Sequence, residues 1–187
     1  MSSQAEYLER VSKLDWDGLR TLWSSIRERR TPDWSPGKAF EYLILRAFQL
    51  DGADVSWPYE VREVGGIQSR EAIEQVDGAV FARGLWCLVE SKDTGDEVNV
   101  EPIAKLRNQL LRRPSSTIGL LFSVGGFTDP ARVLASFLAP QTILLWDCDD
   151  IDYCVRNELV CDPLLRKYRV CVEEGRPDHS LLVERMQ

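Results

Sequence analysis

The sequence is poor in the residues on which histidine and cysteine chemistry depends. It contains one histidine, His179, and five cysteines, none of which form a Cys-x-x-Cys pair. An odd number of cysteines without paired spacing indicates neither a disulfide framework nor a zinc site, so we expect most of them to be buried as small apolar residues. Because His179 lies in a polar C-terminal segment, a histidine-based catalytic triad is not expected either.

Long apolar runs and nucleotide-binding glycine motifs are also missing. No run approaches the length of a membrane span, and residues 1–13 lack the apolar core of a signal peptide. The absence of a P-loop and of a Gly-x-Gly-x-x-Gly motif argues against nucleotide-driven movement. These absences favour a cytoplasmic protein, and 187 residues are enough for one α/β domain with a substantial core.

Charged residues interrupt a strongly apolar pattern in residues 74–93, EQVDGAVFARGLWCLVESKD. The pattern predicts a hairpin of two short strands with a tight turn at residues 83–84, where a glycine can supply positive φ. A turn centred there places Asp77 opposite Glu90. Strand alternation puts Lys92 on the same face as Glu90.

Two opposed carboxylates require neutralisation, because directly paired side chains have Cβ atoms about 4.5–5.5 Å apart. A hard divalent cation such as Mg²⁺ binds such oxygens, and the ammonium of Lys92 would orient an attacking water or stabilise charge on a phosphate. The alternative is a strand-end Asp77 with Glu90 and Lys92 as an ion pair on a solvated face. The apolar run LWCLV before Glu90 is typical of a strand covered on both faces, and it favours the metal site.

Asp77, followed on the next strand by Glu-Ser-Lys at residues 90–92, resembles the PD-(D/E)XK nuclease superfamily with its restriction-endonuclease-like fold. That superfamily often has a further acid on the helix before the hairpin. Glu41 has this place on a helix predicted over residues 36–50, with Ser35 as its N-cap. An ordinary glutamate at the edge of the apolar face is the alternative for Glu41.

Residues 117–151 are similar to the later strand, helix and strand of Mrr-like restriction endonuclease domains, including a Gly-Phe-Thr turn at residues 126–128. The resemblance covers about residues 36–152. The chain departs from the superfamily's name in having Val76 before Asp77 in place of proline. It also has Glu90 where many Mrr-like relatives have glutamine.

The resemblance implies an α/β, three-layer domain in which a mixed sheet is flanked by helices, and the alternation of strands and helices after the hairpin predicts parallel pairing. We expect a single nuclease domain over residues 1–187. Within it, residues 1–33 form an N-terminal helical extension, 36–152 the core, and 153–187 a C-terminal helical segment and tail. Residues 65–75 are expected to form a loop that leads into the hairpin.

The function implied by the resemblance is metal-dependent hydrolysis of phosphodiester bonds. Asp77 and Glu90 would hold Mg²⁺ or Mn²⁺, assisted by the Ser91 carbonyl and Glu41, with Lys92 as the catalytic lysine. DNA is the expected substrate, and a role in restriction or anti-phage defence follows by analogy. An RNA nuclease and a non-catalytic scaffold or interaction subunit of a larger complex stay open as alternatives.

A helix predicted from Pro102 to about Arg113 has a polar, partly basic face that would flank the site. Lys105, Gln109 and Arg112 on this face would contact phosphates, although a solvated surface is the alternative.

The net charge of −7 contrasts with the basic balance usual in proteins that bind nucleic acids. Acids clustered at a metal site, a basic patch hidden in the average and a partner that binds the nucleic acid all remain open as explanations. A chain with one site would also need to dimerise, or to nick twice, to break both strands of a duplex.

Overall fold

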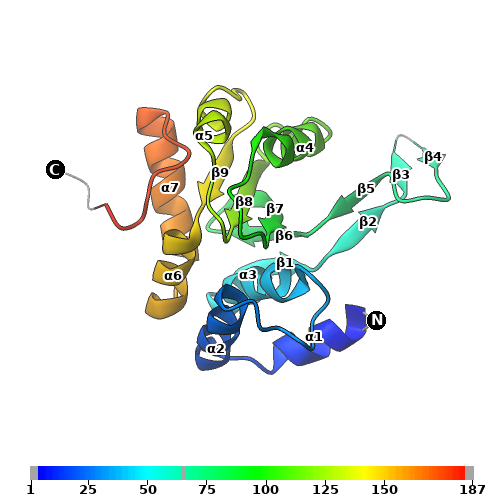
Figure 1. The fold of residues 1–187 in the computed structure, drawn as a ribbon. Helices are drawn as coiled ribbons and strands as arrows, with labels where there is room; N and C mark the ends of the chain where they lie inside the picture. Colours follow the sequence, from blue (N-terminus) through cyan, green and yellow to red (C-terminus); the bar gives the residue numbers. More distant parts are fainter. Residues whose placement is uncertain (1–3, 65, 184–187) are drawn as a thin grey trace.

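The computed structural model describes residues 4–64 and 66–183. Its centre is a mixed five-stranded sheet with the order β1-β6-β7-β8-β9 (Figure 1). The strands are β1 (Asp54–Ser56), β6 (Gly78–Ala82), β7 (Leu85–Lys92), β8 (Ile118–Ser123) and β9 (Ile143–Trp146). β1, β6 and β7 pair antiparallel, whereas β7, β8 and β9 pair parallel. The predicted α/β fold with a mixed, partly parallel sheet is confirmed.

Helices cover both faces of the sheet. One face packs against α3 (Lys38–Leu50), α6 (Cys148–Asn157) and α7 (Cys161–Glu174), and the other against α4 (Val100–Leu110) and α5 (Asp129–Ser136). α2 (Trp16–Arg27) packs on α3 and α6. α1 (Gln4–Ser12) packs on α3 through a smaller apolar cluster. None of the helices in the described part of the chain is long and apolar enough to cross a membrane.

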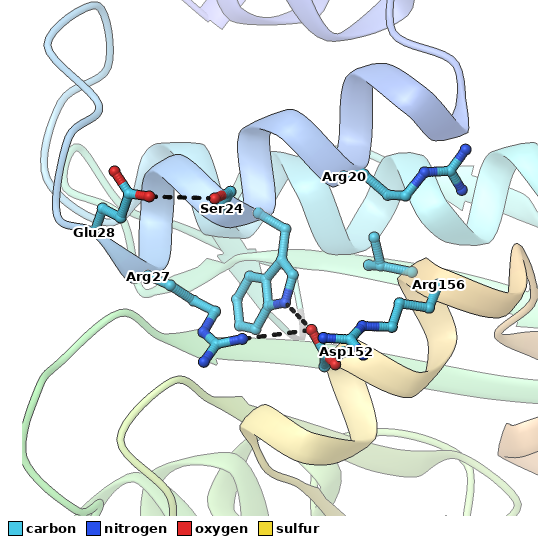
Figure 2. Close-up of a pocket in the computed structure, with 8 residues that line it drawn as sticks. Arg20, Ser24, Arg27, Glu28, Asp152 and Arg156 are labelled. Carbon is cyan, nitrogen blue, oxygen red and sulfur yellow. Dashed lines mark hydrogen bonds and ion pairs between the residues drawn. The ribbon is translucent and has the colours of Figure 1, made fainter.

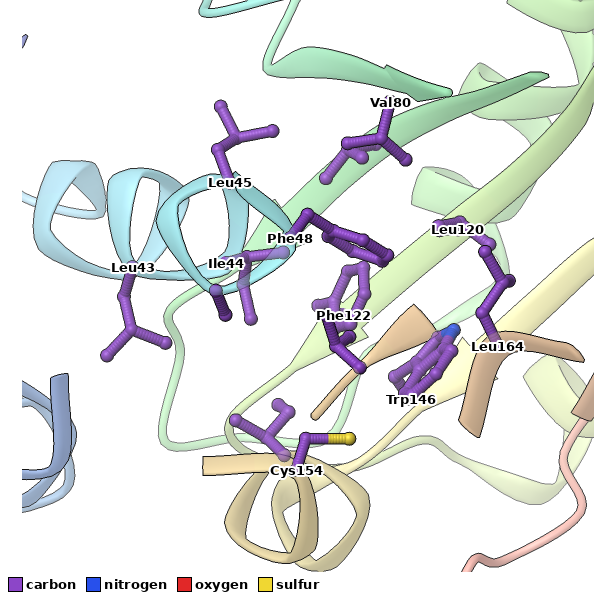
Figure 3. Packing of buried hydrophobic residues seen from close by; sticks show 14 of the residues in the cluster. Leu43, Ile44, Leu45, Phe48, Val80, Leu120, Phe122, Trp146, Cys154 and Leu164 are labelled. Carbon is purple, nitrogen blue, oxygen red and sulfur yellow. The ribbon is translucent and has the colours of Figure 1, made fainter. Parts of the chain in front are cut away.

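The larger core contains a row of aromatic rings between α3 and the parallel strands (Figure 3). Phe122 of β8 stacks on Trp146 of β9 with ring centroids 5.1 Å apart, and Phe48 of α3 meets Phe122 edge-on at 6.3 Å. Cys154 of α6 is also buried in this core. All five cysteines have free thiols, and burial raises the pKa of Cys87 to about 12, as expected for small apolar core residues.

The β6–β7 hairpin has the predicted register. Arg83 and Gly84 form the turn with positive φ values of 53° and 85°, which matches the right-handed twist of the flanking strands. At the other end of the ladder Gly78 pairs with Val89. Asp77 is the next residue outward, so the register directs it towards Glu90.

A two-stranded arm replaces the loop that we expected before the hairpin. Strand β2 (Tyr59–Val61) pairs with β5 (Glu74–Val76), and β3 (Glu63–Val64) pairs with β4 (Ile67–Gln68) further out. The arm projects from the body of the domain (Figure 1). Its base is held to the end of α4 because the buried Glu74 forms ion pairs with Arg112 and Arg113.

Two local predictions are corrected by the structure. α3 begins at Lys38 rather than Pro36, and its N-cap is Gly37 with a φ of 80°. The hydroxyl of Ser35 lies 2.7 Å from that of Tyr7 and does not cap the helix. His179 is buried although it lies in a polar C-terminal segment, and its carbonyl accepts a hydrogen bond from the buried Lys167.

The loop after β7 and the turn after β8 are joined by backbone hydrogen bonds. The Val98 amide donates to the Gly126 carbonyl at 2.9 Å, and the Thr128 amide donates to the Val98 carbonyl at 3.1 Å. Gly125 lies against the backbone of Asp96, where an added Cβ would overlap the Asp96 carbonyl. This contact keeps the segment between Lys92 and α4 close to the sheet.

We expect Gly125→Ala to lower the free energy of unfolding by about 1–3 kcal/mol, because the backbone of residue 96 has to move to admit a methyl group. Gly95→Ala is the matched control, since a Cβ there would make an ordinary 3.6 Å contact with the Arg29 side chain. Urea unfolding of both variants measures the difference. Equal stability of the two variants would contradict the close packing at Gly125.

Candidate active site

Asp77 lies at a bend between β5 and β6, at the base of the arm. One carboxylate oxygen, Oδ2, accepts hydrogen bonds from the Ser91 amide at 2.9 Å and from the Ser91 hydroxyl at 3.2 Å. Burial, and after it the charge of Glu90, raises the pKa of Asp77. The side chain is therefore fixed against β7 beside a second carboxylate.

Glu90 is completely buried on β7, with 0% of its surface exposed. Lys92 Nζ lies 2.5 Å from Oε1, and Lys105 Nζ of α4 lies 2.8 Å from Oε1 and 2.9 Å from Oε2. A buried carboxylate is tolerated in a protein when it is paired and hydrogen-bonded in this way. The strand and the helix thus contribute one ammonium each to the same acid.

Glu41 completes the group of acids from the first turn of α3. It is 6% exposed and accepts hydrogen bonds from Lys38 Nζ at 2.6 and 2.8 Å. Burial, assisted by the negative charges of Asp77 and then Glu90, raises the pKa of Glu41 to about 7. Glu41 is therefore electrostatically coupled to both hairpin acids.

The residues predicted on the polar face of α4 lie in three different environments. Lys105 belongs to the carboxylate group through Glu90. Arg112 is partly exposed and paired with Glu74. Gln109 departs from the expected open face: it is 3% exposed, and its amide donates to the Gln75 carbonyl at 3.0 Å. Gln109 therefore supports the arm from inside the protein.

One side chain at the site, Lys38, and one contact beside it, between Arg29 and Asp93, were missed by sequence reasoning. Lys38 pairs with Glu41, and their spacing of three residues on one helix is a signal that could have been used. Arg29, beyond the end of α2, binds the carboxylate of Asp93 and lies 3.1 Å from its carbonyl. This long-range contact joins α2 to the residue that follows Lys92, and nothing in the local sequence indicates it.

Clefts open on both sides of β5 beside the carboxylates. One, of about 580 Å³, is lined by Glu41, Asp77, Lys38 and Gln75 among others. The other, of about 480 Å³, is lined mainly by residues of β5 and α4, including Lys105. Glu41, Asp77 and the ammonium of Lys105 therefore line space that is open to a substrate at the base of the arm, whereas Glu90 is fully buried.

A separate cleft of about 460 Å³ lies between α2 and α6 and contains none of the predicted site residues (Figure 2). Asp152 in its centre accepts a hydrogen bond from Trp23 Nε1 at 3.3 Å and pairs with Arg27 at 3.5 Å and Arg156 at 2.7 Å. These contacts join the two helices.

The donor chemistry at the hairpin fits a hard divalent cation. Asp77, Glu90 and Glu41 offer carboxylate oxygens, and the raised pKa values of Asp77 and Glu41 reflect burial and mutual repulsion that a cation would relieve. Within residues 4–64 and 66–183, no three acidic, histidine or cysteine side chains are arranged around one ion position. The chemistry fits, and side chains would have to move to bind an ion.

An antiparallel hairpin with an aspartate and a Glu-x-Lys at one end of a mixed sheet, and an acid from the preceding helix beside them, defines the restriction-endonuclease-like class. The family model of the Mrr catalytic domain, described as restriction endonuclease, matches residues 33–155. The chain therefore belongs to the Mrr-like restriction endonuclease family. No curated protein and no solved structure matches it significantly.

The raised pKa of Glu41 predicts a pH-dependent stability. Because the folded state binds this proton more tightly than the unfolded state, the contribution of Glu41 to the free energy of unfolding falls as the pH rises from about 4.5 to about 7. Glu41→Gln removes that loss, so the variant should gain up to about 3 kcal/mol relative to the wild type across this window.

Urea unfolding at several pH values between 4 and 8 would measure this difference, with the exposed Glu97→Gln as control. A stability difference between Glu41→Gln and the wild type that does not change with pH would show that Glu41 titrates normally.

Proposed function

We propose that this protein is a metal-dependent endonuclease that hydrolyses phosphodiester bonds in DNA. The observation that carries the proposal is the gathering of Asp77, Glu90 and Glu41 around the β6–β7 hairpin, with the ammonium of Lys92 beside them and open clefts in front. Membership of the restriction endonuclease family supports a nuclease and implies binding of nucleic acid. DNA as the substrate, and a role in restriction or anti-phage defence, are proposed from the same family.

Asp77 and Glu90 would hold Mg²⁺ or Mn²⁺, with Glu41 and the Ser91 carbonyl as further ligands. A bound divalent cation supplies Lewis acidity and lowers the pKa of a coordinated water. Ser91 keeps the Asp77 carboxylate in position through its amide and hydroxyl. Glu41, with a pKa of about 7, can hold or release a proton at neutral pH.

Lys92 is the proposed catalytic lysine. Its ammonium lies 2.5 Å from the fully buried Glu90, and its side chain is 30% exposed, so part of it is open to solvent beside the acids. There it would donate hydrogen bonds to the attacking water or to the phosphate oxygens as negative charge develops.

Lys105 and Arg112 are the proposed contacts to the nucleic-acid backbone. Both line the cleft between β5 and α4, with side chains 47% and 40% exposed, and such contacts position a strand without reading its sequence. The buried Gln109 is left out of this set.

Lys92→Ala should reduce nicking of supercoiled plasmid at least about 100-fold, because it removes the positive charge beside the reacting phosphate. Lys13→Ala, which removes an exposed lysine from the loop after α1, is the control and should cleave like the wild type. Single-stranded DNA and RNA are incubated in parallel. Equal cleavage by a pure Lys92→Ala sample would refute the catalytic role. No wild-type cleavage of any substrate would favour the non-catalytic interaction module.

Removal of divalent ions should abolish cleavage, and Mn²⁺ added after EDTA treatment should restore it. Asp77→Asn should weaken Mn²⁺ binding, measured by calorimetry, at least about tenfold, because one charged ligand is lost. The exposed Asp54→Asn on β1 is the matched control and should bind Mn²⁺ like the wild type. Full activity in EDTA would exclude the metal-dependent mechanism.

A further inference from the structure

Glu90 is paired with two ammonium groups although it has a single negative charge. Lys105 bridges both carboxylate oxygens at 2.8 and 2.9 Å, and Lys92 binds Oε1 at 2.5 Å. Counted together with the neighbouring Asp77, the two ammonium groups balance two carboxylates.

The ammonium of Lys105 lies where a metal cation bound to Glu90 would lie. It lies nearly equidistant from the two carboxylate oxygens, in front of the carboxylate, where a bound cation would also be attracted. Two cations cannot share this position, since like charges at such short range repel strongly in a partly buried site. Binding of a divalent ion by Glu90 and pairing of Lys105 with Glu90 are therefore in competition.

Of the two lysines, Lys105 is the one that can move away from Glu90. It extends from α4 rather than from the strand of Glu90, its side chain is 47% exposed, and it lines the cleft that also contains Arg112. A long lysine side chain at this exposure can rotate into water with little loss of packing. Lys92 contacts one oxygen only and is more deeply placed, at 30% exposure.

We propose that Lys105 is a positioning residue that holds Glu90 until a divalent cation binds, and that it then turns into the β5–α4 cleft to contact a substrate phosphate. The inference rests on the proposed function and adds an order of events to it. Lys105 becomes available to contact the nucleic-acid backbone only once the cation is bound. Cation binding and substrate binding are thereby coupled through one side chain.

Calorimetric titration with Mn²⁺ in the absence of nucleic acid tests the competition. Lys105→Gln should bind Mn²⁺ about tenfold more tightly than the wild type, because the competing charge is gone. Arg107→Gln removes an equal charge from an exposed position on the same helix and should change the affinity less than twofold. Thermal unfolding of the free proteins shows that each variant is folded.

Equal or weaker Mn²⁺ binding by Lys105→Gln would overturn the inference while leaving the proposed metal site in place. Mn²⁺ binding by Lys105→Gln but not by the wild type would support the inference most strongly. If neither the wild type nor this variant binds Mn²⁺, the metal site of the proposed function fails and the inference fails with it.

Chemical labelling of the wild type provides a test that needs no variant. Mn²⁺ should increase the rate of acylation of Lys105, measured by mass spectrometry, several-fold relative to Lys13, an exposed lysine that is paired with Glu9 at the surface. An unchanged rate at saturating Mn²⁺ would show that Lys105 stays on Glu90 and would overturn the proposal.

Discussion

The site is organised by the need to neutralise the fully buried carboxylate of Glu90. Left unpaired, such a charge would cost several kcal/mol, so Lys92 and Lys105 have to reach it. The buried apolar face of α4, which includes Ile103 and Leu106, orients the helix so that Lys105 reaches Glu90. Gln109 lies one turn further on the same face, and it therefore meets β5 and holds the base of the arm through the Gln75 carbonyl.

Because Gly78 has no side chain, α3 can pack closely against the hairpin. Gly78, the residue after Asp77, lies so close to Leu45 that an added Cβ would be 2.6 Å from a Leu45 methyl group. Glu41 is one turn before Leu45 on the same face of α3, so the contact that seats Leu45 on Gly78 also places Glu41 beside Asp77. Packing at one glycine thus assembles acids from two distant parts of the chain.

The sequence was sufficient to predict the features that depend on local periodicity. The turn at Gly84 determines the register that directs Asp77 towards Glu90, and the helical repeat places Glu41 on the edge that faces the sheet. The arm was not predicted, because its strands are two or three residues long and have little periodicity of their own. The burial of Gln109 was missed for a related reason: a polar side chain facing a strand carbonyl cannot be distinguished by sequence from one facing water.

The acidic net charge is compatible with a site for phosphates once local charge is considered. The three carboxylates of Glu41, Asp77 and Glu90 are matched by three lysines, Lys38, Lys92 and Lys105, so the site itself is balanced. Acids elsewhere on the surface are screened over a distance of about 8 Å at physiological salt. A bound divalent cation would turn the balanced group into a positive one, so the attraction for a phosphate would arise together with the catalytic ion.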